Sequence, residues 1–250
     1  LIKMITNLLK KIIKIFLKKI GWRLEKIVIP KEYRPYPPEK KLVSEIIDST
    51  GILHLGAHRG SEAAIYEYFA KSVVWVEANP KIFESLKENL FTFKKQKPLC
   101  ALLGNEDGKI VDFNLSSNDS ASSSIFEYGE LSTGEKTLWP NRKFKMLNRI
   151  KLKMRTIDSL LNENNINAEE YNHWVMDLQG AELLAFMGAT ESIKSCRSIY
   201  IEISKGDVYK GGAQWNDIVK FLKKHNFSPA WQPKHNHVDV LFVKENFISK

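Results

Sequence analysis

Apolar residues in this chain follow two kinds of pattern, which alternate from residue 39 onward. Short continuous apolar runs are typical of strands buried on both faces, and apolar residues spaced by three or four are typical of helices. The expected strands are 51–55, 72–77, 99–103, 109–115, 174–178, 198–204, 227–232 and 238–243, and the expected helices are 39–49, 61–70, 80–90, 182–187 and 215–225. Strands separated by helices predict an α/β fold with a mostly parallel sheet, and the last two strands predict a closing antiparallel pair that makes the sheet mixed.

The first 38 residues show a different pattern. Apolar residues recur at helical spacing from Ile5 to Ile20 with lysines on the other side, and four prolines follow between Pro30 and Pro38. This predicts an amphipathic basic helix and a linker, ahead of one larger domain at 39–250. The lysines interrupt every apolar run well below the roughly 20 residues of a membrane span. Residues 1–26 are therefore expected either to lie on an anionic membrane face or to pack on the domain or a partner subunit.

Residues 116–150 interrupt the alternation of strands and helices. The stretch begins with the serine-rich residues 116–124, and its later aromatic residues include Tyr128 and Trp139. Long loops in compact domains are usually functional or disordered. We expect a substrate lid, with a plain surface loop as the alternative.

The net charge of +9 belongs mainly to the start of this 250-residue chain. Residues 1–50 hold 12 Lys and Arg against 5 Asp and Glu, which leaves 26 against 24 for residues 51–250. Because the body is nearly neutral and shows no aromatic-basic pattern, it does not favour nucleic-acid binding.

Cysteine and histidine are sparse. Cys100 and Cys196 lie far apart next to apolar runs, which predicts two buried thiols in a cytoplasmic protein. No CxxC or HExxH pattern occurs, and His235 with His237 form the one close histidine pair, which suits a surface turn better than a metal. We predict no metal site.

The run 52–60 predicts a buried strand that enters a small-residue turn and then a helix, and the next apolar run, 73–76, ends on Glu77. This is how an α/β sheet holds a nucleoside, because the backbone approaches the ligand at the turn and the acid hydrogen-bonds the ribose diol. The turn lacks GxGxxG spacing and the GK[ST] ending of a phosphate loop. A ligand with an adenosine diol and no phosphate fits better, and S-adenosylmethionine is the common one.

Five segments, in order, make the resemblance specific. They are the turn 56–60 with the VEANP segment 76–80, the serine-rich 118–124, RTIDSL at 155–160, MDLQGAE at 176–182, and IYIEI at 199–203. Over roughly residues 50–245 the chain resembles FkbM-type S-adenosylmethionine-dependent methyltransferases. The resemblance implies a seven-stranded, Rossmann-like class I methyltransferase sheet with helices on both faces and methyl transfer, usually to oxygen, on sugars of glycans or on natural products.

The resemblance also implies the cofactor-binding residues. The methionine part would be wrapped by four residues of the turn, namely Gly56, Ala57, His58 and Gly60. Glu77 would take the ribose hydroxyls with Asn79 beside it, and Leu102, in the segment 101–105, would border the adenine.

Three further residues are candidates for catalysis. Asp177 ends a strand at the carboxyl edge of the sheet, where it could hold the cofactor's ammonium group, orient the acceptor hydroxyl, or cap the next helix. Glu202 lies in an apolar strand and is either a partnered core acid or a base facing the substrate. A sugar hydroxyl acceptor benefits from a general base, for which Asp177, Glu202 and either His235 or His237 are the candidates, with His237 our prediction.

The leading hypothesis is therefore O-methylation of a glycan, a lipid-linked saccharide or a related small molecule by a cytoplasmic enzyme, which could lie on the inner membrane face. The sequence allows a homodimer. An RNA methyltransferase and a non-catalytic, membrane-tethered binding module on the same fold are the alternatives.

Overall fold

The computed structural model describes residues 40–69 and 71–245. The predicted helix and linker of residues 1–38 lie outside the described residues. No helix in the described part is long and apolar enough to cross a membrane.

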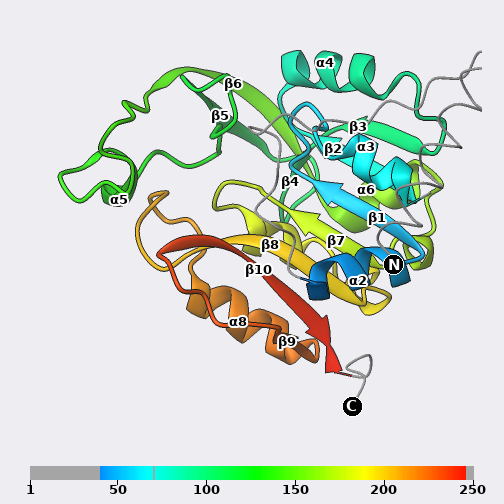
Figure 1. The fold of residues 1–250 in the computed structure, drawn as a ribbon. Helices are drawn as coiled ribbons and strands as arrows, with labels where there is room; N and C mark the ends of the chain where they lie inside the picture. The colour runs from blue at the N-terminus through cyan, green and yellow to red at the C-terminus, as the bar shows by residue number, and fades with distance from the viewer. Residues whose placement is uncertain (1–39, 70, 246–250) are drawn as a thin grey trace, which may run out of the picture. The chain divides into compact units, whose positions relative to one another are not determined.

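One sheet of seven strands forms the centre of the described domain (Figure 1). Its strands, in spatial order, are β3 (Gln96–Cys100), β2 (Ser72–Glu77), β1 (Gly51–Leu55), β7 (His173–Met176), β8 (Ser198–Ser204), β10 (His237–Lys244) and β9 (Phe227–Pro229). The first five pair in parallel, and β10 runs antiparallel to both of its neighbours. The predicted mixed sheet and its closing antiparallel pair are confirmed.

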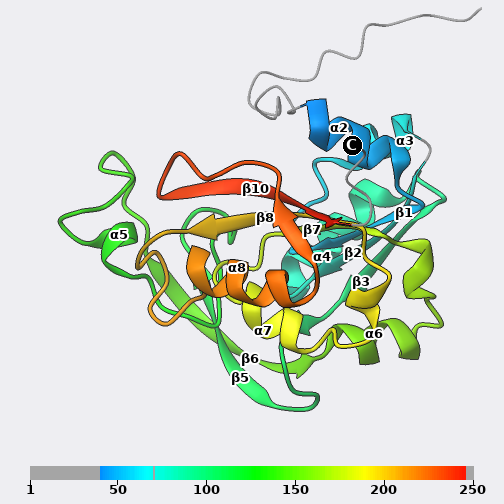
Figure 2. The same cartoon turned by 90° about the horizontal axis from the view of Figure 1, so that it is seen from below.

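Helices cover both faces of this sheet (Figure 2). Those of the described residues are α2 (Lys40–Asp48), α3 (Ala63–Tyr68), α4 (Pro80–Leu90), α5 (Glu130–Thr133), α6 (Ile157–Glu163), α7 (Glu182–Met187) and α8 (Trp215–Lys224). Successive residues of a strand point to opposite faces, so Leu53 and Leu55 enter the core beneath α6, α7 and α8. Ile52 enters the core beneath α2, α3 and α4. The predicted fold class is confirmed.

A second, smaller sheet forms beside the first from β4 (Leu102–Leu103), β6 (Met146–Arg155) and β5 (Ile110–Ser116). The pattern did not predict β6, whose first five residues fall in the stretch expected as an insertion, 116–150. Four of its ten residues are Lys or Arg, because one face of the strand meets solvent. The strand expected at 99–103 is also divided, since the chain leaves β2 after Ala101 and pairs with β6 instead. Cys100 is exposed rather than buried, and Cys196 is buried as expected.

Candidate active site

The turn after β1 is shaped by Gly56. Its φ of +87° lies in the left-handed region, and a Cβ there would overlap the carbonyl oxygen of Asp177. Glycine is the residue that accepts both conditions, because it has no side chain. β1 and β7 are neighbours in the sheet, so the turn lies against the end of β7. Gly60 also has a positive φ but faces Leu86 of α4, where a Cβ would come within 2.7 Å of Cδ1.

Glu77 connects the turns after β1 and β2. Its Oε2 accepts the backbone N–H of His58 at 2.8 Å and its Oε1 accepts that of Asn79 at 2.7 Å. The side chain is buried, which raises the pKa of the carboxyl group, while these two hydrogen bonds oppose the rise. A carboxylate has about four acceptor positions, so Glu77 keeps capacity for a further donor.

A cavity of about 610 Å³ opens beside Glu77, at the carboxyl edge of the sheet. It is lined by residues of the two turns, of the segment 101–103, of β5, of the loop 120–125 and of the turn after β7. Five of the predicted site residues line it: Gly56, His58, Glu77, Leu102 and Asp177.

Three predicted cofactor residues lie next to this cavity rather than in its lining: Ala57, Gly60 and Asn79. Ala57 is buried in the core beneath α4. The Asn79 side chain accepts the backbone N–H of Lys81 at 3.0 Å and caps the start of α4. These residues therefore shape the turns, while the cavity wall comes from their neighbours.

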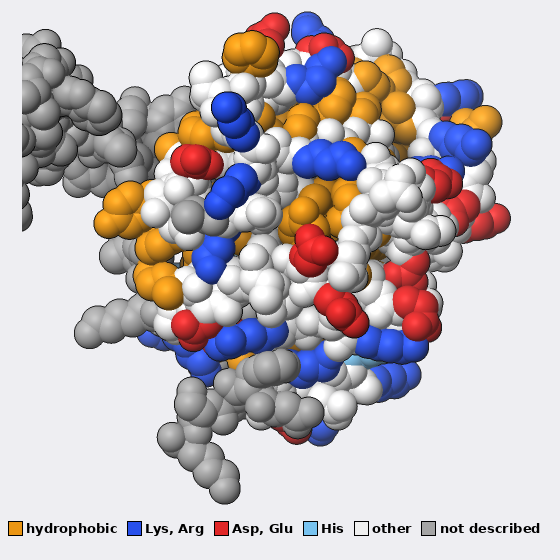
Figure 3. Space-filling model, turned by 90° about the vertical axis from the view of Figure 1, so that its right-hand side faces the viewer, with side chains coloured by type: hydrophobic (Ala, Val, Ile, Leu, Met, Phe, Trp, Pro, Cys, Tyr) orange, Lys and Arg blue, Asp and Glu red, His pale blue; other side chains and the backbone are white. Residues whose placement is uncertain are grey.

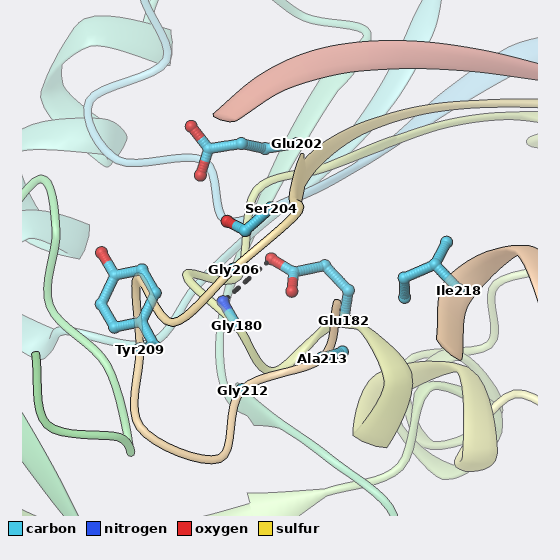
Figure 4. A pocket seen from close by; sticks show the side chains of 9 residues that line it. All are labelled: Gly180, Glu182, Glu202, Ser204, Gly206, Tyr209, Gly212, Ala213 and Ile218. Carbon is cyan, nitrogen blue, oxygen red and sulfur yellow. Dashed lines mark hydrogen bonds between the residues drawn. The ribbon is translucent and has the colours of Figure 1, made fainter. Parts of the chain in front are cut away.

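A second cavity, of about 340 Å³, lies on the other side of the turn after β7 (Figure 4). Glu202 and Ser204 of β8, Tyr209 of the following loop and Glu182 of α7 are among the residues that line it (Figure 4). The carboxylate of Glu182 accepts the backbone N–H groups of Leu178 at 2.8 Å and Gly180 at 3.2 Å. Glu182 thus holds the turn in place, as a fixed acceptor for backbone groups.

Gln179 stands between the two cavities and joins their polar groups. Its amide nitrogen donates to Asp177 and, at 3.0 Å, to Glu202 Oε2, and its amide oxygen accepts from the Tyr209 hydroxyl. Its φ of +54° is unusual for a residue with a side chain. The sequence analysis did not single out Gln179 or Tyr209; the only signal was the place of Gln179 in the segment 176–182.

The polar chain continues from Glu202 to His237. Glu202 Oε1 lies 3.0 Å from His237 Nε2, and His237 Nδ1 lies 3.0 Å from the Ser204 hydroxyl. All three predicted catalytic residues, Asp177, Glu202 and His237, are therefore linked through Gln179. His235, the alternative to His237, is exposed in the turn before β10.

Burial shifts the pKa values of the side chains in this hydrogen-bonded network. It raises the pKa of Glu202 to about 8, assisted by the charges of Asp239 and Glu182. It raises the pKa of Asp177 well above its usual range, assisted by the charge of Glu202. Burial also lowers the pKa of His237, against the pull of the surrounding carboxylates. Both shifts in the Glu202–His237 pair favour a neutral imidazole beside a carboxyl group that can gain or lose a proton near neutral pH.

The serine-rich segment lies over the first cavity. Ser120, Ala121 and Ser123 line it, and Asp119 makes an ion pair at 2.8 Å with Arg59 of the β1 turn. Farther along the expected lid, the Trp139 ring meets the His237 ring edge-on at 5.2 Å between centroids. Residues of the stretch 116–150 therefore contact both the predicted cofactor residues and the predicted base.

The first cavity fits the predicted cofactor. Glu77 keeps acceptor capacity for the hydroxyls of a ribose, and the cavity wall also includes the apolar side chains of Leu102, Leu103 and Phe113. In the described ranges no group of three or more His, Cys, Asp or Glu side chains is placed to hold a metal ion.

The strand order and the antiparallel β10 define a class I methyltransferase fold. The sequence model of the methyltransferase FkbM domain matches residues 54–229, and the chain belongs to this family. The match confirms the predicted family of S-adenosylmethionine-dependent methyltransferases. A comparison with curated proteins found no match.

Several solved structures are similar in fold. TrmK of M. capricolum, solved with S-adenosylhomocysteine, is 9% identical, with 81% of this chain and 67% of that chain covered and a TM-score of 0.41. Magnesium protoporphyrin IX methyltransferase of Synechocystis, solved with S-adenosylmethionine, is 10% identical, with 82% and 77% covered and a TM-score of 0.41. Fibrillarin of Aeropyrum pernix is 12% identical, with 79% and 68% covered and a TM-score of 0.40.

Proposed function

We propose that this protein transfers the methyl group of S-adenosylmethionine to a hydroxyl oxygen of a sugar, on a glycan, a lipid-linked saccharide or a related natural product. The observation that carries the proposal is the chain of hydrogen-bonded side chains from Asp177 through Gln179 and Glu202 to His237. It begins in the wall of the first cavity and reaches the second. Glu202, which can accept a proton, therefore lies in the second cavity, next to the cofactor cavity.

Each part of the first cavity has a task in this proposal. Glu77 would accept the ribose hydroxyls, the segment 101–103 would contact the adenine, and the backbone at Gly56 would pass close to the methionine part. The ion pair of Arg59 and Asp119 would hold the serine-rich segment over the bound cofactor and so exclude water.

When bound, S-adenosylmethionine supplies a methyl group on a sulfonium sulfur, so the protein's own tasks are to align the acceptor oxygen and to take up its proton. We assign the proton to Glu202, which is hydrogen-bonded to Gln179 and His237 at once. Asp177 has the role of orienting the amide of Gln179, which fixes Glu202 in turn.

The second cavity favours a neutral, hydroxyl-rich acceptor. Its wall offers the carboxyl group of Glu202 and the hydroxyls of Ser204 and Tyr209, which can each bind an alcohol. When ionised, the carboxyl groups of Glu182 and Glu202 disfavour an anionic group there. Outside this wall, Trp139, whose ring meets that of His237 edge-on, adds the kind of aromatic surface on which a sugar ring can pack.

Mass spectrometry of glycans and lipid-linked saccharides from cells with and without the gene tests this proposal. We expect one saccharide to lack a methyl ether when the gene is absent, and to regain it with the wild-type gene but not with Glu202→Gln. Unchanged saccharides together with a lost methyl group on RNA would favour the RNA methyltransferase alternative. Tight binding of S-adenosylhomocysteine without any change in methylation would favour a binding module.

A further inference from the structure

The strands β5 and β6 carry an unusual concentration of positive charge. Residues 142–155 hold seven Lys and Arg and no Asp or Glu. Residues 51–250 as a whole hold only two more basic than acidic residues, so the rest of the body is slightly acidic. The near-neutral total therefore conceals a strongly basic segment.

The register places three of these charges on one face of a two-stranded ribbon. Lys153 lies opposite Ile110, Lys151 opposite Asp112, and Arg149 opposite Asn114. Side chains two residues apart point to the same face, about 6.8 Å apart along an antiparallel strand. The exposed residues on this outer face of the β5–β6 ribbon are Arg149, Lys151 and Lys153 from β6 and Ile110 from β5. The exposed Leu147 and Lys145 adjoin this face, beyond a shift in the register between Leu115 and Ser116.

The other face of the ribbon belongs to the domain. Met154 is buried against Gly104, and Phe113 lines the cofactor cavity. Figures 1 and 2 show the ribbon on the side of the domain away from α2. The outer face is thus a surface at the edge of the active site.

Acidic side chains neutralise only part of this surface. Asp112 contacts Lys151 at 3.0 Å and Arg149 at 3.8 Å, and Glu127 contacts Arg149 at 3.7 Å. Lys145 and Lys153 have no ion pair with any carboxylate among the described residues. Figure 3 shows a contrasting face, the one to the right in Figure 1, on which acidic and basic side chains are interspersed.

Two aliphatic side chains are exposed among these cations. Leu147 is 67% exposed and lies between Lys145 and Arg149 in the sequence, and Ile110 is 66% exposed opposite Lys153. Proteins that bind single-stranded nucleic acid stack bases on aromatic side chains, and the outer face carries none. Lysines around exposed aliphatic side chains are instead suited to a surface with anionic head groups above hydrocarbon.

We propose that the outer face of the β5–β6 ribbon docks on a lipid bilayer that contains anionic lipids. The basic side chains contact head groups, and Leu147 and Ile110 enter the boundary of the acyl chains. The opposite face of the ribbon then holds the cofactor cavity near the bilayer. The docking does not depend on the methyl acceptor, so it stands or falls separately from the proposed function.

Sedimentation of the full chain with vesicles tests the docking. The vesicles are phosphatidylcholine alone or phosphatidylcholine with phosphatidylglycerol. The test variant replaces Lys145, Lys151 and Lys153 with Gln, and the matched control replaces Lys220, Lys223 and Lys224 of α8, which are equally exposed, with Gln. Each basic residue at an anionic surface contributes about fivefold in partitioning, so the ribbon variant should bind roughly 100-fold more weakly and the control much less so.

A second variant tests the aliphatic contact. Leu147→Ser with Ile110→Ser should weaken binding to the anionic vesicles and leave binding to single-stranded RNA unchanged, with an unaltered melting temperature because both side chains are exposed. Equal binding by the ribbon variant and the control would overturn the proposal. So would a ribbon variant that loses affinity for RNA while it keeps its affinity for vesicles.

Discussion

Replacement of Glu77 by Gln separates cofactor binding from folding. The carboxylate accepts two backbone N–H groups, from His58 at 2.8 Å and Asn79 at 2.7 Å, and the side chain lines the first cavity. An amide keeps only one acceptor atom, so one ribose hydroxyl loses a charged partner. A hydrogen bond to a charged group contributes about 1.5–3 kcal/mol, which predicts roughly 10- to 150-fold weaker binding of S-adenosylhomocysteine.

The same substitution should affect stability much less. Burial raises the pKa of Glu77, which means that the fold disfavours the ionised carboxylate more than the backbone hydrogen bonds favour it. A neutral amide removes that desolvation cost and offsets the backbone hydrogen bond that is lost. We expect the melting temperature to change little while the affinity falls.

Glu182→Gln provides the matched control. Glu182 is also buried, also accepts two backbone N–H groups, and also has a raised pKa, but it lines the second cavity. Isothermal titration calorimetry with S-adenosylhomocysteine should show a loss of affinity for Glu77→Gln that far exceeds that for Glu182→Gln. Wild-type affinity in Glu77→Gln, or equal losses in the two variants, would refute the assignment of Glu77 to the ribose.

Two further predictions concern the base and the glycine turn. If Glu202 takes the acceptor proton, the rate of methyl transfer should rise with pH as Glu202 ionises and level off above a pKa of about 8. Glu202→Gln should lose this pH dependence, and its rate should fall by about 10²- to 10⁴-fold. A wild-type pH profile in this variant would exclude Glu202 as the base. Gly56→Ala should unfold at lower temperature than Gly108→Ala, because both positions have a positive φ but a Cβ at Gly56 overlaps Asp177, whereas at Gly108 the nearest atom is 3.6 Å away. Equal melting temperatures would contradict this account of the turn.

The continuous apolar runs made β1, β2 and β8 predictable, because strands covered on both faces have little choice of residue. β6 was missed because its outer face meets solvent and its cations interrupt every apolar run. Its alternation of Lys or Arg with Ile, Leu and Met has the period of two that marks a half-exposed strand. This period predicts a strand, but the high density of charged residues is equally typical of a loop.

For the site, the sequence identified residues better than it identified their contacts. Glu77 is where the strand-end pattern placed it, and Asp177 lies beside the same cavity. Asn79 instead caps α4, since a side chain after a strand can point to the helix as readily as to the ligand. Gln179 gave no signal of its own, because its role depends on a left-handed backbone that brings one amide to Asp177, Glu202 and Tyr209 together.

The most direct measurement incubates the purified full chain with methyl-labelled S-adenosylmethionine and separate extracts of saccharide, lipid-linked saccharide and RNA, and follows both the label and the release of S-adenosylhomocysteine. The account predicts label in a saccharide, attached as an alkali-stable methyl ether, with equal amounts of S-adenosylhomocysteine formed and both signals abolished together in a Glu77→Ala variant. Label in RNA alone, or no release of S-adenosylhomocysteine with any extract although the wild-type protein binds it, would contradict the central claim.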